Sequence, residues 1–169
     1  MSKLNITKEK PNEIQQIREI NLQAFETKAE ADLVDRLRDS GVPIISLVAE
    51  MDKKLVGHIL FTPMTMNNYD IKIAGLAPMA VPPDYQNKGI GSALIEKGFE
   101  YCIEENYVAV AVLGHPNYYP KFGFVPSTRF DLISEYDVPK EVFMIKELVS
   151  NSLSKISGVI KYHEEFSRL

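Results

Sequence analysis

The fold of this chain is decided by the stretch Val81-Pro82-Pro83-Asp84-Tyr85-Gln86-Asn87-Lys88-Gly89-Ile90-Gly91-Ser92-Ala93-Leu94. An apolar run typical of a strand ends at Val81, a Pro-Pro turn follows, and two glycines open a long amphipathic helix. The first-turn N–H groups of a helix have no intrahelical partner and lie at the positive end of its dipole, so they bind anions such as phosphate. Gly89 and Gly91 let the backbone approach such a group, and Lys88 adds a positive charge. We therefore expect an anion-binding turn here.

Two familiar phosphate motifs do not fit this turn. The dinucleotide fingerprint G-x-G-x-x-G/A needs a small residue where Leu94 stands, and a G-x-x-x-x-G-K-[ST] loop is absent from the sequence. What remains is Gln86-x-x-Gly89-x-Gly91, which resembles the pyrophosphate-binding signature Q/R-x-x-G-x-G/A of the Gcn5-related N-acetyltransferases (GNAT). Taken alone, this short motif also fits a turn without a ligand, or an ATP- or NAD-binding protein that shares only the glycines.

Length and composition favour one soluble domain. A chain of 169 residues with 45% hydrophobic content can bury one sizeable core, so we expect a single domain over residues 1–169. The net charge of −4 argues against a general nucleic-acid or anionic-membrane surface. The single Cys102 cannot form an internal disulfide, and its spacing from Leu94 and Gly98 predicts a buried structural thiol. No apolar signal segment or membrane-spanning run is visible, so a cytoplasmic protein is expected.

The first half of the chain alternates strands and helices. We expect a strand at residues 4–7, a helix from about Asn12, a second helix that stops at Gly41, and an antiparallel hairpin of residues 44–50 and 55–61. Pro63 should limit the second hairpin strand. Thr27 and Glu30 have the spacing of a capping box, so Glu30 is interpreted as a helix cap in preference to a substrate-binding residue.

The second half predicts a strand, a crossover helix and a parallel strand. Residues 71–81 form a long strand interrupted by Gly75 and Pro78, which should bulge or lose its partner near its end and admit a ligand. Residues 107–113 should lie parallel to it if the helix at about 89–105 crosses over between them. Late strands are expected at 142–145 and 158–162, with a short helix or loop at 147–155. The helix carries one predicted buried stripe, which comprises Leu94, Ile95, Gly98, Phe99, Cys102 and Ile103.

This order of elements resembles the whole GNAT fold, well beyond the glycine motif. The resemblance is to a bacterial subgroup of predicted N-acetyltransferases known as YhbS-like. It implies an acyl-CoA N-acyltransferase (GNAT) fold of the α/β class, with a mixed, mostly antiparallel sheet, flanking helices and a splayed parallel strand pair where acetyl-CoA enters. The matching residues are Ala24-Phe25, Leu33, Leu37-Arg38, Ser46-Leu47-Val48-Ala49, Val56-Gly57-His58-Ile59, Leu76-Ala77-Pro78-Met79-Ala80-Val81, Leu113-Gly114-His115-Pro116-Asn117-Tyr118-Tyr119 and Phe122-Gly123-Phe124.

The resemblance also assigns residues to the cofactor. Main-chain groups of Met79, Ala80 and Val81 would bond the pantetheine, and an amide there would polarise the thioester carbonyl. Leu113 and Asn117 would flank the cofactor on the opposite strand and the segment after it. The CoA pyrophosphate would be held by the backbone N–H groups of Gln86, Asn87, Lys88, Gly89, Ile90, Gly91 and Ser92.

Tyr119 occupies the family's Tyr-x-x-x-Gly-Phe position, where the hydroxyl lies near the departing sulfur. A phenol suits that task, since it can donate a proton to a thiolate leaving group. Tyr118 is a neighbouring rival. The general base stays open among Glu26, Glu50, His58 and His115, and the spacing of the histidines implies no metal site.

We therefore expect an N-acetyltransferase that moves an acetyl group from acetyl-CoA directly to a primary amine. Cys102 is in the wrong place to form a covalent intermediate. The alternative is a non-catalytic CoA- or acyl-CoA-binding regulatory module. The acceptor, whether a small metabolite, an antibiotic-like amine, a protein lysine or an N-terminus, is left open by the sequence, and so is a homodimer formed through the late strands.

Overall fold

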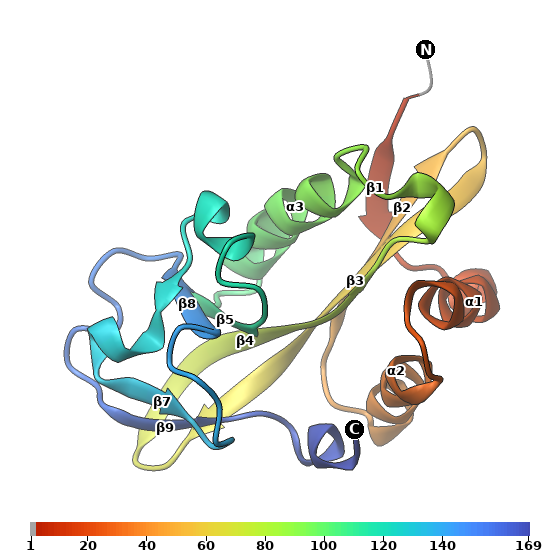
Figure 1. Cartoon of the computed structure of the whole chain (residues 1–169). Coiled ribbons are helices and arrows are strands. Elements are labelled where there is room, and N and C mark those ends of the chain that lie inside the picture. Colours follow the sequence, from red (N-terminus) through yellow and green to blue (C-terminus); the bar gives the residue numbers. More distant parts are fainter. Residues whose placement is uncertain (1–2) are drawn as a thin grey trace. The chain divides into compact units, whose positions relative to one another are not determined.

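A computed structural model describes residues 3–169 of the chain (Figure 1). Its strands form a mixed, mostly antiparallel sheet flanked by helices. Pairing is parallel between β4 (Tyr69–Ala80) and β5 (Ala109–Leu113) and between β7 (Leu132–Ser134) and β9 (Gly158–Lys161). The chain divides into two compact units. Unit 1 comprises the described residues up to Phe61, with Ala77–Gly98 and Glu164–Leu169, and unit 2 comprises Thr62–Leu76 and Phe99–His163. Each unit is described by itself below.

Unit 1 contains an antiparallel meander of β1 (Asn5–Lys8), β2 (Ile45–Met51) and the first part of β3 (Lys54–Met66). The predicted hairpin is confirmed. Its two turn residues, Asp52 and Lys53, both have positive φ, at 53° and 64°, which is the backbone that a tight two-residue hairpin turn requires.

Two helices of unit 1 lie side by side (Figure 1), and both were predicted. The first, α1 (Ile14–Ala24), follows a 3-10 turn at Pro11–Glu13, and the second, α2 (Ala29–Ser40), ends at Gly41 with φ +79°. Arg18 of α1 bridges them, since its guanidinium lies 2.9 Å from Asp32 and 2.8 Å from Asp35 of α2.

The predicted cap of α2 is wrong. The N-cap residue is Lys28 and makes no side-chain capping bond, so the helix begins one residue later than a capping box on Thr27 requires. Glu30 is therefore the second helical residue instead of the third, and a carboxylate at that position does not form the box. Its Oε1 atom is buried and has no hydrogen-bond partner among the described residues.

The crossover helix α3 (Ile90–Glu104) packs on β3 at two glycines within unit 1. A Cβ on Gly57 would lie 2.9 Å from Ile90 Cγ2, and one on Gly98 would lie 2.3 Å from Phe61 Cζ. Only glycine allows this close approach of helix and strand. The predicted buried stripe is confirmed from Leu94 to Cys102, whereas Ile103 is 53% exposed and was predicted wrongly.

Unit 2 contains the parallel pair. Ile73 of β4 (Tyr69–Ala80) pairs with Ala109 of β5 (Ala109–Leu113), as predicted, and β8 (Phe143–Glu147) runs antiparallel to β5. The other strands of the unit are the short β6 (Val125–Pro126), which pairs with β8, and β7 (Leu132–Ser134), which pairs with β9 (Gly158–Lys161).

Pro63 does not limit β3, contrary to the prediction, because the strand continues to Met66. Thr65 and Met66 find antiparallel partners in Lys161 and Ile160 of β9. The strand therefore has a partner in β9 two residues after the proline. No helix among residues 3–169 is long and apolar enough to cross a membrane.

Candidate active site

The glycine turn between β4 and α3 leaves a row of backbone N–H groups without helical partners. The first intrahelical bond at this end is donated by Ala93 to the carbonyl of Gly89, at 3.0 Å. The N–H groups of Ile90, Gly91 and Ser92 therefore have no acceptor within the helix. They lie at the positive end of a 15-residue helix dipole, where an anion is stabilised.

The outer side of this turn is open. Gly89 has φ +83°, and a Cβ built on it would meet no atom within 4 Å. Asn87 is also left-handed, with φ 62°. The glycine at 89 is thus required by its backbone conformation and not by packing. The space beside the Gly89 Cα atom is therefore open.

Gln86 closes the base of the turn. Its side-chain Nε2 donates to the carbonyl of Val81 at 2.9 Å, which ties the end of β4 to the start of the glycine segment. Its own N–H donates to the carbonyl of Pro83 at 3.3 Å. Among the residues expected to hold the pyrophosphate, Gln86 therefore braces the turn, while Asn87 to Ser92 present its open face.

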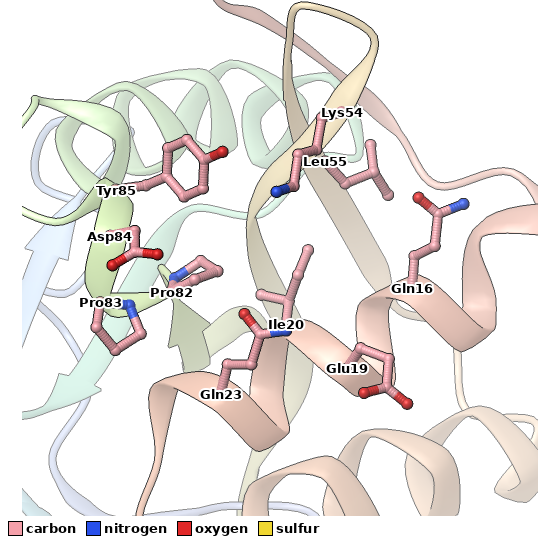
Figure 2. Close-up of a pocket in the computed structure, with 10 residues that line it drawn as sticks. All are labelled: Gln16, Glu19, Ile20, Gln23, Lys54, Leu55, Pro82, Pro83, Asp84 and Tyr85. Carbon is pink, nitrogen blue, oxygen red and sulfur yellow. The ribbon is translucent and has the colours of Figure 1, made fainter.

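A pocket of about 410 Å³ lies beside the turn, within unit 1 (Figure 2). One wall is the segment Pro82–Tyr85, another is α1 with Glu19, Ile20 and Gln23, and Lys54 and Leu55 of β3 complete it. The Nζ of Lys54 lies 5.3 Å from the centre of the Tyr85 ring, and that of Lys88 lies 5.7 Å from it. Two cations thus stand beside the segment that leads into the glycine turn.

The candidate pantetheine strand is the end of β4 in unit 1, where Ala80 is fully buried and Met79 and Val81 are half-buried. Within unit 2, the parallel pairing of β4 with β5 stops at Gly75 and Ala111, although β5 continues for two residues to Leu113. Loss of the ladder beyond Gly75 agrees with the prediction for this strand, and it leaves main-chain groups at the end of β5 without partners in β4.

The remaining site candidates belong to unit 2. Leu113 is 40% exposed at the end of β5, and Asn117 is exposed in the loop that follows. Tyr119 begins a 3-10 turn that runs to Phe122. The structure thus groups Met79 to Ser92 in one unit and Leu113, Asn117 and Tyr119 in the other.

Tyr119 is firmly held. A Cβ on Gly114 would lie 2.5 Å from its Cε2 atom, so the ring lies directly against the backbone of Gly114. Its ring also packs edge-on against Phe124 and Tyr118, with centroids 5.7 and 5.1 Å away. Burial, with a smaller effect of Tyr118, raises the pKa of Tyr119 to about 12. The phenol therefore keeps its proton at neutral pH and is a hydrogen-bond donor.

Tyr118, the rival for that role, is engaged differently. The ammonium of Lys121 lies 4.1 Å from the centre of its ring, and Phe122 packs against it edge-on. The glycine of the Tyr-x-x-x-Gly-Phe element ends the 3-10 turn, since Gly123 has φ +95°. Lys146 fills the space beside it and donates to the carbonyl of Phe122 at 2.8 Å. These contacts fix the segment that carries Tyr119.

His58, one of the four candidate bases, is completely buried in a polar network. Its Nε2 lies 2.9 Å from Ser46 Oγ, and its Nδ1 lies 3.2 Å from Asn21 Nδ2. Because Asn21 Nδ2 can only donate, Nδ1 is the acceptor and Nε2 carries the hydrogen. Burial lowers the pKa of His58 to about 4. Both ring nitrogens are occupied and no solvent reaches the ring, which disfavours His58 as a base for a substrate.

The network continues to a charged pair. Ser46 Oγ donates to Glu9 at 2.5 Å, and Glu9 accepts from Arg38 at 2.7 Å. The residue that follows β1, strand β2 and helix α2 are thereby joined to His58. The sequence predicted no role for Glu9 or Ser46 in this network, since its members lie up to 49 positions apart.

The other candidate bases are accessible to different degrees. Glu26 and His115 are exposed, and Glu50 is half-buried beside a β-bulge in β2. Cys102 is fully buried, and burial raises the pKa of its thiol to about 12, which confirms the structural thiol. Within residues 3–169, no group of three or more His, Cys, Asp or Glu side chains is arranged to hold a metal ion.

Comparison with known proteins agrees with this geometry. The model of the acetyltransferase (GNAT) family matches residues 13–124. The chain is 43% identical over 153 residues to the N-acetyltransferase YjhQ of Escherichia coli K12. The aligned region covers 86% of this chain and 84% of YjhQ. The chain is also 34% identical over 146 residues to the N-acetyltransferase YhbS of the same organism, which covers 86% of this chain and 87% of YhbS.

Solved structures are similar over nearly the whole chain. The crystal structure of Escherichia coli YhbS in complex with CoA matches with a TM-score of 0.95 and 31% identity, and covers 100% of this chain and 94% of YhbS. A GNAT acetyltransferase from Brucella melitensis in complex with acetyl-CoA matches with a TM-score of 0.79 and 28% identity, and covers 97% of this chain and 98% of that one.

Proposed function

Because the chain belongs to the acetyltransferase (GNAT) family and is an N-acetyltransferase that uses acetyl-CoA, we propose that it transfers the acetyl group directly to a primary amine. The observation that carries the proposal is the open turn at Gly89, where unpaired N–H groups of Ile90, Gly91 and Ser92 offer a site for pyrophosphate. The residues present at this turn fit the cosubstrate.

The proposal assigns the remaining cofactor contacts as follows. Asn87, Lys88 and Gly89 complete the pyrophosphate site, and Gln86 holds the turn in shape through its bond to Val81. Met79, Ala80 and Val81 bind the pantetheine through main-chain groups. Leu113 and Asn117 flank the cofactor, and both are exposed and free to do so.

Transfer needs no covalent bond between the acetyl group and the enzyme. The neutral amine nitrogen attacks the thioester carbonyl carbon, and the oxygen of the tetrahedral intermediate is stabilised by a main-chain N–H group at the end of β4. The carbon–sulfur bond then breaks, and the CoA thiolate receives the proton of the Tyr119 hydroxyl. The nitrogen loses its proton to a base. Cys102 takes no part, since its thiol is buried and remains protonated.

A non-catalytic CoA-binding module is not favoured, because the relatives that match most of this chain are N-acetyltransferases. We propose that the chain acts as one acetyltransferase domain, since β3, β4 and α3 each contribute residues to both compact units. A cytoplasmic location, where acetyl-CoA is available, belongs to the same proposal.

A homodimer is also proposed. Ile133 of β7 and Val159 of β9 are paired neighbours and are 52% and 36% exposed, which gives the late strands an apolar face. Light scattering on the purified protein tests this point, and a monomer at every concentration measured would refute it.

The first experiment is a calorimetric titration with acetyl-CoA and CoA, with ATP and NAD as controls. Binding of the two CoA compounds alone is expected. Released thiol is then measured with acetyl-CoA and a panel of amines that includes diamines, amino-sugar compounds and peptides with a free N-terminus or lysine. Absence of turnover on every amine, with CoA binding intact, would favour the non-catalytic module.

A further inference from the structure

Helix α2 carries a carboxylate that the fold does not use. Glu30 is half-buried, and its Oε1 atom is fully buried without a hydrogen-bond partner among the described residues. A buried carboxylate oxygen normally accepts hydrogen bonds, because removing it from water without compensation costs stability. The buried, unpaired Oε1 atom of Glu30 therefore needs a physical explanation. Capping of α2 does not supply one, since the N-cap residue is Lys28.

Other charged side chains on and around α2 form ion pairs. Asp32 and Asp35 pair with Arg18 at 2.9 and 2.8 Å, and Arg36 pairs with Glu165 at 2.9 Å. Arg38 pairs with Glu9 at 2.7 Å. Arg18, Arg36 and Arg38 are thus already engaged with other acids.

Glu30 extends the inner face of the helix. Leu33, Val34 and Leu37 follow it at three, four and seven positions, the spacing of one helical face, and each is at most 1% exposed. The apolar stripe of α2 therefore begins with an acidic residue at its N-terminal end. The positive end of the helix dipole lies at this end of α2, but no hydrogen bond from residues 3–169 reaches Oε1.

We propose that Glu30 binds the protonated amine of the acceptor before transfer. An ammonium group supplies what Oε1 lacks, since it brings both a charge and up to three donors. A metal ion is a poorer occupant, because no cluster of ligating side chains surrounds Glu30 within residues 3–169. Glu30 belongs to the same compact unit as the candidate pantetheine strand Met79–Val81. The inference rests on the proposed function, since it names the charged form in which that acceptor is recognised.

Propylammonium chloride is a suitable probe, because it is a minimal primary ammonium ion and does not depend on knowing the acceptor. Thermal unfolding is measured at about 50 mM propylammonium, with sodium chloride and propanol as controls at the same concentration. We expect propylammonium alone to raise the Tm of the wild type by about 2 to 4 °C. The variant Glu30→Gln, which keeps the shape and removes the charge, should lose this shift.

Asp39→Asn is the matched control, since Asp39 is an exposed acid on the same helix. It should keep the propylammonium shift. An absent shift in the wild type, or an undiminished shift in Glu30→Gln, would overturn the assignment.

A second variant separates binding from a structural role. Glu30→Met replaces the unsatisfied carboxylate by an apolar chain of similar length, so its Tm without ligand should rise by about 2 °C. A fall of several degrees would mean that the carboxylate holds the fold together and would contradict the proposal. Acetyl-CoA titration of the wild type and Glu30→Gln completes the test. Both proteins should bind acetyl-CoA with equal affinity. If the wild type did not bind acetyl-CoA at all, the cofactor assignment would be refuted, and not the role of Glu30.

Discussion

The ring of Tyr119 lies so close to Gly114 that a single methyl group on that glycine would stand 2.5 Å from Tyr119 Cε2. Gly114 comes directly after β5, and Tyr119 begins the 3-10 turn five residues later. The N–H groups of Tyr118 and Tyr119 both donate to the carbonyl of His115, at 3.1 and 3.3 Å, which folds the segment back on itself. The orientation of the proposed acid is therefore set by the backbone of its own loop.

Tyr119→Phe should reduce turnover by about 100-fold and leave acetyl-CoA affinity within about twofold of the wild type. The ring and its packing are kept, and only the proton donor is removed. Because the pKa of Tyr119 is raised to about 12, the wild-type donor stays protonated throughout the usual assay range. Stopped-time thiol release and calorimetry measure the two quantities. Turnover equal to that of the wild type would remove Tyr119 from the acid role.

Gly114→Ala should also lower turnover, by about tenfold, because the new methyl group displaces the Tyr119 ring. The double variant Gly114→Ala with Tyr119→Phe tests this cause. If the new methyl group lowers turnover only by displacing the Tyr119 hydroxyl, the double variant should have the same turnover as Tyr119→Phe alone. Two independent losses that multiply would show that Gly114 affects the reaction by another route.

Gly89→Ala should weaken acetyl-CoA binding by at least about fivefold, and Gly41→Ala is its matched control. Both glycines have left-handed backbones, at φ +83° and +79°, and neither has an atom within 4 Å of a new Cβ. Each substitution should cost about 1 kcal/mol of stability through backbone strain. Calorimetry should then show a loss of affinity for Gly89→Ala alone. Equal affinities in the two folded variants would contradict the pyrophosphate assignment.

Local patterns in the sequence predicted much of the fold. The hairpin at 45–61, the glycine stop of α2 and the crossover of α3 depend on turn residues and on one-face periodicity, both of which are local. The continuation of β3 past Pro63 was missed because the proline alone does not reveal which strands flank it: β4 is a neighbour of β3 in the sheet, and β9, almost 100 residues later, pairs with Thr65 and Met66. The exposure of Ile103 was missed because the helical spacing of apolar residues shows which face of α3 is buried. It does not show whether the rest of the protein still covers that face at the last turn of the helix.

The candidate site was predicted unevenly for the same reason. The glycine turn is contiguous in sequence, so its N–H row was predicted from spacing alone. The brace from Gln86 to Val81 and the support of Tyr119 by Gly114 involve specific side-chain orientations, which the motif does not specify. Glu30 was misassigned because a helix start displaced by one residue turns a capping acid into an unpaired one.

His58 makes the folded state sensitive to acid. Burial lowers its pKa from 6.5 to about 4, so between these values the unfolded chain binds a proton that folded His58 does not. The contribution of His58 to stability is therefore fully present above pH 6.5 and falls as the pH drops toward 4, by roughly 3 kcal/mol. For Glu9, burial opposes the hydrogen bonds from Arg38 and Ser46, yet its pKa is lowered overall, so its contribution is lost at still lower pH.

His58→Gln should remove most of the loss of stability between pH 6.5 and about 4, because an amide does not titrate there. Near neutral pH the variant should itself be less stable by about 1 to 3 kcal/mol, since Ser46 or Asn21 loses a buried partner. Urea unfolding at a series of pH values measures both effects. His115→Gln, at an exposed histidine, should keep the wild-type slope. An unchanged slope in His58→Gln would mean that the acid sensitivity arises from other groups.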